Sequence, residues 1–151
     1  MCENTPWYSW KNRNDLPNKR QPAVYFLALS EPDISGTEFN MIKEIIYIGM
    51  SVSQKGVTGR LNQFERAMKG ADGTHGGAER VRFKHIPNDH FFDRLYVSIC
   101  SFPISASRNT SDDLRSMGEC VKHEYVNIAD YLDRHGILPE FNDPKRSKKK
   151  I

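Results

Sequence analysis

One stretch of the chain, residues 44–64 (EIIYIGMSVSQKGVTGRLNQF), constrains the fold more than any other. Its short apolar run at 45–48 ends at Gly49, and a run of that length is typical of a buried strand. Small and polar residues follow, and a helix-like segment then carries Arg60. A strand, a glycine turn and a basic residue on the next helix are a common way to present a phosphate-binding group, although they do not by themselves name a function.

The remaining elements follow from the same kind of pattern. Short apolar runs rich in Val, Ile and aromatic residues predict strands. The predicted strands are residues 23–29, 45–48 and 94–100. Apolar residues at helical spacing predict helices at 57–69 and 112–134, and residues 78–85 form either a short basic helix or an edge strand. Because one loop, at 30–43, joins the first two strands, we expect an antiparallel pair. The sequence predicts a small α/β (α+β) protein with a mainly antiparallel three-stranded sheet flanked by helices.

Basic residues are unevenly distributed along the 151-residue chain. The net charge is +3, from 22 Lys and Arg against 19 Asp and Glu, and the segment 145–150 holds five of the basic residues. Without these five, 17 basic residues face 19 acidic ones, so a nucleic-acid interpretation cannot rest on charge alone. We divide the chain into an aromatic and basic N-terminal arm (1–22), one domain of ordinary size (23–142) and a basic C-terminal tail (143–151).

Two interpretations stay open for each terminal segment. The arm holds Trp7, Tyr8 and Trp10 among Lys and Arg residues. Such aromatic side chains can stack on bases while the basic ones hold phosphates, or they can pack the arm onto the core. The tail is either a phosphate-seeking arm or a disordered solubilising end.

The number and spacing of the cysteines indicate whether the protein resides in a reducing or an oxidising compartment. Cys2, Cys100 and Cys120 are odd in number and lack a CxxC spacing, which argues against a disulfide framework and favours a reducing, intracellular setting. No apolar run approaches the roughly 20 residues that span a bilayer. The first residues lack the apolar block of a secretory signal. We therefore expect an intracellular protein with no membrane partner.

Taken together, five motifs resemble the GIY-YIG nuclease superfamily over residues 23–142. The elements that carry the resemblance are Ala23-Val24-Tyr25, Tyr47-Ile48-Gly49, Arg60, Glu124 and Asn142. The chain departs from the family in three respects: Ala23 replaces a glycine, the connection from Tyr25 to Tyr47 is longer than in compact members, and Met50 stands where those members often carry a lysine. One motif alone is weak, but five in the same order are far more specific.

The resemblance implies a metal-dependent DNA endonuclease of restriction, mobile-element or repair type, bacterial or phage-encoded, acting as a monomer or homodimer. It implies that Tyr25 acts as, or positions, the general base, and that Tyr47 supports the site by hydrogen bonding. Arg60 would hold a phosphate oxygen, Glu124 would bind one Mg²⁺ or Mn²⁺ ion, and Asn142 would orient the glutamate or the nearby backbone. The alternative is a non-cleaving nucleic-acid-binding module that retains the nuclease fold.

Further residues are candidates for substrate binding. His75, in a glycine-rich loop at 70–77, would touch the phosphate or substitute for the missing lysine. Gly49 and Lys55 belong to the turn that follows the second predicted strand. Because a tyrosine with a pKa of about 10 is a poor base at neutral pH, Arg60 or the metal would have to favour the phenolate of Tyr25.

Two glutamates on the last helix compete for the role of metal ligand. At about 100° per residue, an apolar stripe forms on that helix, and we expect it to face the core. The stripe consists of Leu114, Met117, Val121, Tyr125, Ile128 and Leu132. Glu124 falls at the edge of this stripe, whereas Glu119 falls roughly opposite, towards solvent. A metal ligand must point into the site from an anchored backbone, so we choose Glu124.

Overall fold

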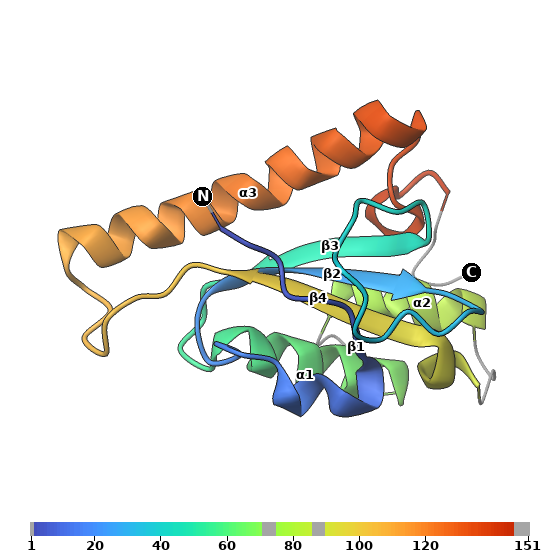
Figure 1. Ribbon diagram of the computed structural model, residues 1–151, viewed down its shortest axis with the longest axis horizontal. Helices are drawn as coiled ribbons and strands as arrows, with labels where there is room; N and C mark the ends of the chain where they lie inside the picture. The colour runs from blue at the N-terminus through green and yellow to red at the C-terminus, as the bar shows by residue number, and fades with distance from the viewer. Residues whose placement is uncertain (1, 71–74, 86–89, 147–151) are drawn as a thin grey trace.

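A four-stranded antiparallel sheet organises the computed structural model of the chain, which describes residues 2–70, 75–85 and 90–146 (Figure 1). The strands are β1 (Tyr8–Ser9), β2 (Ala23–Leu29), β3 (Ile45–Ser51) and β4 (Leu95–Ser101), in the order β1-β4-β2-β3. The three predicted strands are present, and the antiparallel pairing of β2 with β3 is confirmed. The predicted count of three is one strand short, because two-residue β1 is too brief to show any periodicity in the sequence.

Helices cover both faces of this sheet. Helices α1 (Gly56–Met68) and α2 (Gly76–His85) lie on one face, and α3 (Ser111–His135) crosses the other (Figure 1). Of the two interpretations of residues 78–85, the helix is therefore the one observed. Short 3-10 turns are η1 (Trp10–Asp15), η2 (Phe91–Arg94) and η3 (Glu140–Asn142). Within the described ranges, no helix is long and apolar enough to cross a membrane.

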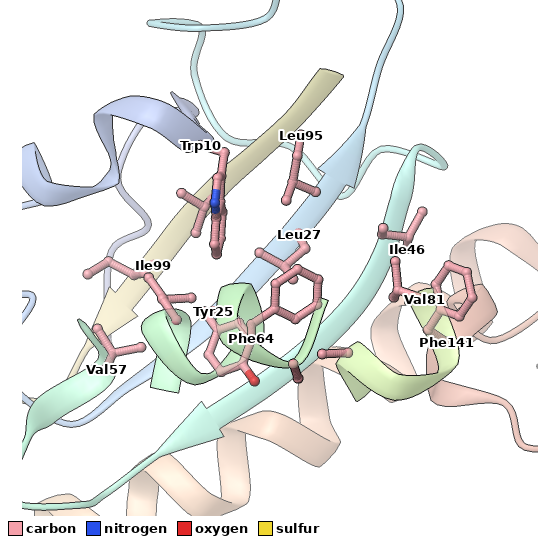
Figure 2. Packing of buried hydrophobic residues seen from close by; sticks show 14 of the residues in the cluster. Trp10, Tyr25, Leu27, Ile46, Val57, Phe64, Val81, Leu95, Ile99 and Phe141 are labelled. Atoms are coloured by element: carbon pink, nitrogen blue, oxygen red, sulfur yellow. The ribbon is translucent and has the colours of Figure 1, made fainter. Parts of the chain in front are cut away.

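The position of β2 inside the sheet explains why its sequence is apolar without interruption. Successive side chains of a strand point to opposite faces, and both faces of this strand are covered. Tyr25 and Leu27 enter the cluster beneath α1 and α2 (Figure 2). Val24 and Phe26 enter the cluster beneath α3. The central strand therefore carries two cores, and one of its side chains in the first core is a candidate catalytic tyrosine.

The N-terminal segment packs onto the core. Trp7 and Trp10 are only 2% and 1% exposed, and the Trp10 ring lies 5.4 Å from the Phe64 ring (Figure 2). The segment also caps α1, because the backbone N–H groups of Val57 and Thr58 donate to carbonyls at 21 and 19. For these two tryptophans the packing interpretation is correct, and the rings are not available to stack on bases.

Helix α3 begins with a capping box, in which Thr110 and Asp113 exchange side-chain and backbone hydrogen bonds. Its orientation contradicts the predicted stripe. Leu114, Val121 and Tyr125 are 58%, 39% and 72% exposed, whereas Cys120 and Tyr131 are buried. The face that contacts the sheet is thus turned by roughly a quarter of a circle from the apolar stripe.

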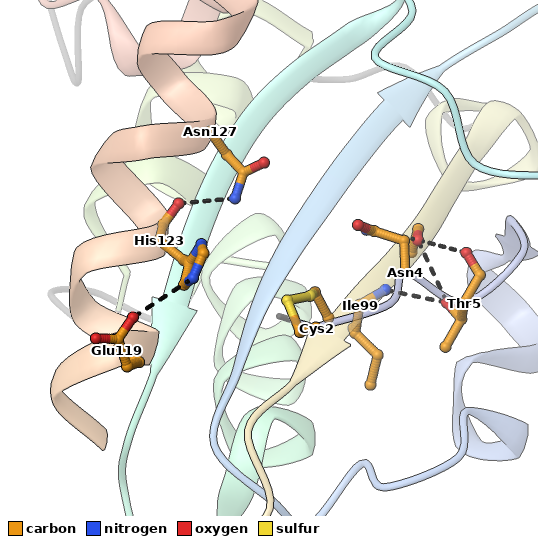
Figure 3. Close-up of a disulfide and its surroundings, with 9 residues drawn as sticks. Cys2, Asn4, Thr5, Ile99, Glu119, His123 and Asn127 are labelled. Atoms are coloured by element: carbon orange, nitrogen blue, oxygen red, sulfur yellow. Dashed lines mark hydrogen bonds and ion pairs between the residues drawn. A yellow bond between two sulfur atoms is a disulfide. The ribbon is translucent and has the colours of Figure 1, made fainter. Parts of the chain in front are cut away.

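The cysteines contradict the expectation of free thiols. Cys2 and Cys100 form a disulfide, with Cα atoms 5.6 Å apart, and Cys120 remains a free, buried thiol (Figure 3). The bond attaches the start of the chain to β4, and it removes the cysteine argument for a reducing compartment. The basic tail is described only as far as Arg146, so the interpretation of residues 147–151 lies outside the described ranges.

Candidate functional site

Two tyrosines on the central strands form the floor of the candidate site. Tyr25 on β2 and Tyr47 on β3 point to the same face of the sheet, with ring centroids 6.1 Å apart. Tyr25 pairs across the strands with Gly49. A Cβ atom on Gly49 would lie 2.5 Å from Cζ and Oη of Tyr25, so only glycine leaves room for this ring. The absence of a side chain at the buried Gly49 therefore makes room for the Tyr25 ring.

The start of α2 covers both tyrosines. His75 is 1% exposed, and its Nε2 lies 2.8 Å from Oη of Tyr25. Its burial does not favour the predicted direct contact with a phosphate, and it places the ring behind Tyr25. Gly77 follows closely, since a Cβ atom there would lie 2.5 Å from Cζ of Tyr47. Sequence reasoning missed Gly77, for which the signal is the glycine pair directly after the histidine.

Arg60 is the positive charge that acts on every member of the site. It projects from α1, where its Nη1 donates to Oε1 of Gln63 at 2.9 Å. Its charge lowers the pKa of Tyr25, of Tyr47 and of Glu124, and it also lowers the pKa of His75. We call Tyr25, Tyr47, Arg60, His75 and Glu124 the tyrosine cluster.

Burial controls the ionisation of Tyr25. Desolvation is the largest influence and raises the Tyr25 pKa well above its ordinary value, and the neighbouring Tyr47 raises it further. The charge of Arg60 and a hydrogen bond from Arg60 lower this pKa without overcoming burial. Arg60 alone is thus insufficient to favour the phenolate, so any further lowering of the Tyr25 pKa would have to come from the metal ion.

Glu124 joins the cluster from the opposite side of the sheet. It is half-buried on α3, where desolvation raises its pKa while Arg60 and a hydrogen bond from the Met50 backbone lower it. Glu119 is exposed and faces His123, with 3.7 Å between Oε2 and Nε2 (Figure 3). The choice of Glu124 over Glu119 agrees with this geometry, although the stripe on which it was based is exposed.

Asn142 supports the site through the backbone. Its Oδ1 accepts from the Ile48 N–H at 2.8 Å, and its Nδ2 donates to the Ile48 carbonyl at 2.9 Å. Of the two roles expected for Asn142, orienting the nearby backbone is the one that these contacts support. The side chain fixes the outer edge of β3 between Tyr47 and Gly49.

Two basic residues differ from expectation. Lys55 is exposed at the N-cap of α1, and within the described ranges no hydrogen bond or ion pair joins it to the tyrosine cluster. Arg80 on α2 is not among the site residues that the sequence predicts, yet its charge lowers the pKa of Tyr47. The basic character of residues 78–85 was the signal that could have identified it.

The cluster supplies a single carboxylate for a metal ion. Among the described residues, no group of three or more His, Cys, Asp or Glu side chains is arranged to hold one. Mg²⁺ nevertheless retains several waters and binds through one or two carboxylates plus substrate phosphate, so the half-buried Glu124 fits this mode. No family model matches the chain, and no curated protein or solved structure matches it either.

Proposed function

We propose that the chain is a metal-dependent DNA endonuclease of the GIY-YIG type. The observation that carries this proposal is the convergence of the tyrosine cluster. Its members come from β2, β3, α1, the start of α2 and α3, yet one guanidinium influences all the others. The order of the motifs in the sequence supports the same assignment.

Phosphodiester hydrolysis requires charge neutralisation at the phosphate and a positioned water. The planar fork of Arg60 can hold a nonbridging phosphate oxygen through two parallel hydrogen bonds. Glu124 would hold one Mg²⁺ or Mn²⁺ ion, which when bound supplies positive charge to the phosphate and to the leaving oxygen. Of the two roles that the resemblance implies for Tyr25, we assign it to positioning the general base, because burial raises its pKa and Arg60 does not offset this rise.

Plasmid nicking with Mg²⁺ or Mn²⁺ tests the proposal. We expect the wild-type protein to nick supercoiled DNA and Glu124→Gln to lose this activity by on the order of 10²-fold or more. Glu119→Gln is the matched control, because it removes the same charge from the same helix on the side away from the cluster. Loss of nicking in Glu119→Gln with activity retained in Glu124→Gln would contradict the assignment.

A non-cleaving DNA-binding module is the second candidate. The near-complete burial of Tyr25 favours it, because a reacting group must meet its substrate. Wild-type protein that binds DNA but does not cut with either metal would establish this module in place of the nuclease. For either function we expect an intracellular location, where DNA is present. Light scattering on the same preparations measures whether the protein is a monomer or a homodimer.

A further inference from the structure

Three connections meet at the end of the sheet where β3 and β4 finish and β2 begins. They are residues 16–22, 52–55 and 102–110. The backbone N–H of Phe102 donates to the carbonyl of Pro22 at 2.8 Å. Nη2 of Arg108 donates to the carbonyl of Val52 at 2.5 Å. Segments that are far apart in the sequence therefore form one end of the molecule, at the left of Figure 1.

Two glycines bring basic residues of this end close to the start of α1. Gly56 has a φ of +72°, and a Cβ atom there would lie 2.3 Å from the carbonyl carbon of Arg20. Only glycine therefore allows the first connection to pack so closely against the helix. The side chain of Lys55 lies along Gly59, whose Cβ would come within 2.6 Å of the Lys55 Cβ. Since Arg60 is the next residue, this surface reaches the tyrosine cluster.

The segments that meet here are free of acidic residues. Residues 16–30, 45–64 and 95–111 contain no Asp or Glu. They hold five Lys and Arg residues, whereas all 19 acidic residues of the chain lie elsewhere. Outside residues 145–150 the chain as a whole has more acidic than basic residues, so this end is a local concentration of positive charge.

Four of these basic residues, which we call the basic rim, are not neutralised by a carboxylate. The basic rim consists of Lys19, Arg20, Lys55 and Arg108. Among the described residues, none of the four forms an ion pair, and the hydrogen bonds from Lys19 and Arg108 go to backbone carbonyls. In contrast, Arg94 pairs with Glu31 at 2.8 Å. Arg20 and Lys55 are exposed, so an anion in solution can reach them.

Two aspartates directly follow the third segment, but other groups engage them. Asp112 pairs with Arg115 on the same helix at 3.2 Å. Asp113 is buried and accepts hydrogen bonds from Ser105 and Thr110, which lower its pKa to about 2. Both carboxylates therefore serve the start of α3, and the positive charge of the basic rim remains.

The basic rim borders the tyrosine cluster on two sides. On one side, Lys55 lies along the residue that precedes Arg60. On the other side, Arg108 holds the carbonyl of Val52, two residues after Met50, whose backbone N–H bonds to Glu124. A chain of phosphates that has one member at Arg60 would therefore have its neighbours beside the basic rim.

We propose that the basic rim binds the phosphate backbone of the DNA substrate next to the phosphate held at the tyrosine cluster. This inference rests on the proposed function for the identity of the polyanion. Each strand of DNA carries a negative charge about every 3.4 Å along the helix axis, which provides several phosphates within the span of such a surface. Backbone contacts of this kind fix the position of the duplex and carry no base sequence information.

Binding of a short fluorescent DNA duplex, followed by anisotropy at several NaCl concentrations in EDTA, tests the inference without cleavage. We expect the double variant Arg20→Gln with Lys55→Gln to raise the dissociation constant by about 10-fold or more. The slope of log K against log salt should fall by about 2, because two phosphate contacts are lost. Arg20→Lys with Lys55→Arg keeps both charges and should bind close to wild type.

The matched control removes the same two residue types from the opposite end of α1. Arg66 and Lys69 are exposed in and just after its last turn, and Glu65 keeps its ion pair with Arg13 when Lys69 is replaced. Arg66→Gln with Lys69→Gln therefore has the same net charge as the double variant of the basic rim. It should change the dissociation constant by less than about 3-fold.

Equal losses in the two glutamine variants would overturn the inference, because binding would then follow net charge and not the basic rim. Wild-type affinity in Arg20→Gln with Lys55→Gln would overturn it too, as would tighter binding of an RNA duplex of the same length. Rim-dependent DNA binding without nicking would instead reject the nuclease and leave the basic rim as the surface of a DNA-binding module. Nicking by a protein whose binding ignores the basic rim would reject this inference alone.

Discussion

Helices α1 and α3 carry similar apolar stripes, yet only α1 buries its stripe against the sheet. Val57, Leu61 and Phe64 on α1 are at most 1% exposed, as their spacing predicts. On α3 the corresponding stripe is turned by roughly a quarter of a circle from the face that contacts the sheet, and Tyr125 is 72% exposed. Periodicity thus identified both helices, but it identified the buried face of only one.

The two helices contact different parts of the sheet. Helix α1 lies over apolar side chains of the first core, so its apolar stripe is buried. Helix α3 also lies against backbone atoms at and before the β3 edge, where Tyr131 donates to the Lys43 carbonyl at 2.8 Å and Met50 donates to Glu124. Buried backbone groups need polar partners, so the inward face of α3 includes polar side chains.

Truncation of an aromatic ring should reveal the largest difference between the two helices in their contribution to the free energy of unfolding. Phe64→Ala on α1 removes a fully buried side chain and should lower the free energy of unfolding by about 3–5 kcal/mol. Tyr125→Ala removes a ring of similar size from α3 and should change it by less than about 0.5 kcal/mol. Urea titration of both variants checks this, and similar losses in the two would refute the assigned orientation of α3.

Removal of a single hydroxyl group from α3 should lower the free energy of unfolding by a smaller amount. Tyr131→Phe keeps the buried ring but leaves the carbonyl of Lys43 without its donor, at a cost of about 1–2 kcal/mol in the free energy of unfolding. Tyr125→Phe is the matched control and should be neutral. Thermal unfolding monitored by circular dichroism compares the two, and an unchanged Tyr131→Phe variant would show that α3 does not depend on this backbone contact.

The smallest effect concerns a glycine on the exposed face. A Cβ atom on Gly118 would meet nothing within 4 Å, so Gly118→Ala should stabilise the protein by about 0.5–1 kcal/mol through helix propensity alone. Gly49→Ala is the contrasting variant, because its Cβ has no room beside Tyr25. If Gly118→Ala instead destabilises the protein in chemical denaturation, the exposed face of α3 contacts a second molecule in solution.

The sequence predicted the elements whose signals are local. Strands β2 and β4 and helix α1 appear with nearly the expected bounds, because run length and spacing are properties of the segment itself. Strand β1, at two residues, is too short to carry such a signal. The inward face of α3 could not be predicted, since backbone atoms of another segment decide it, and the pairing of Cys2 with Cys100 likewise depends on the folded chain.

The residues of the candidate site also divide into those that the sequence predicts and those that it does not. The resemblance assembled Tyr25, Tyr47, Arg60 and Glu124, and the structure brings these side chains together. The place of His75 behind Tyr25 was not predictable, because it follows from the way α2 begins over the sheet. A loop sequence states which residue types are present but not which atoms they approach.

The double hydrogen bond from Asn142 to Ile48 also has a consequence for association between molecules. An edge strand exposes backbone donors and acceptors that can recruit a strand from another chain and so begin aggregation. On β3, Asn142 occupies the N–H and the carbonyl of Ile48, and the opposite edge of the sheet is the two-residue strand β1. The Asn142 side chain thus blocks the pairing of a further strand with β3 at Ile48, which opposes growth of the sheet into a fibril.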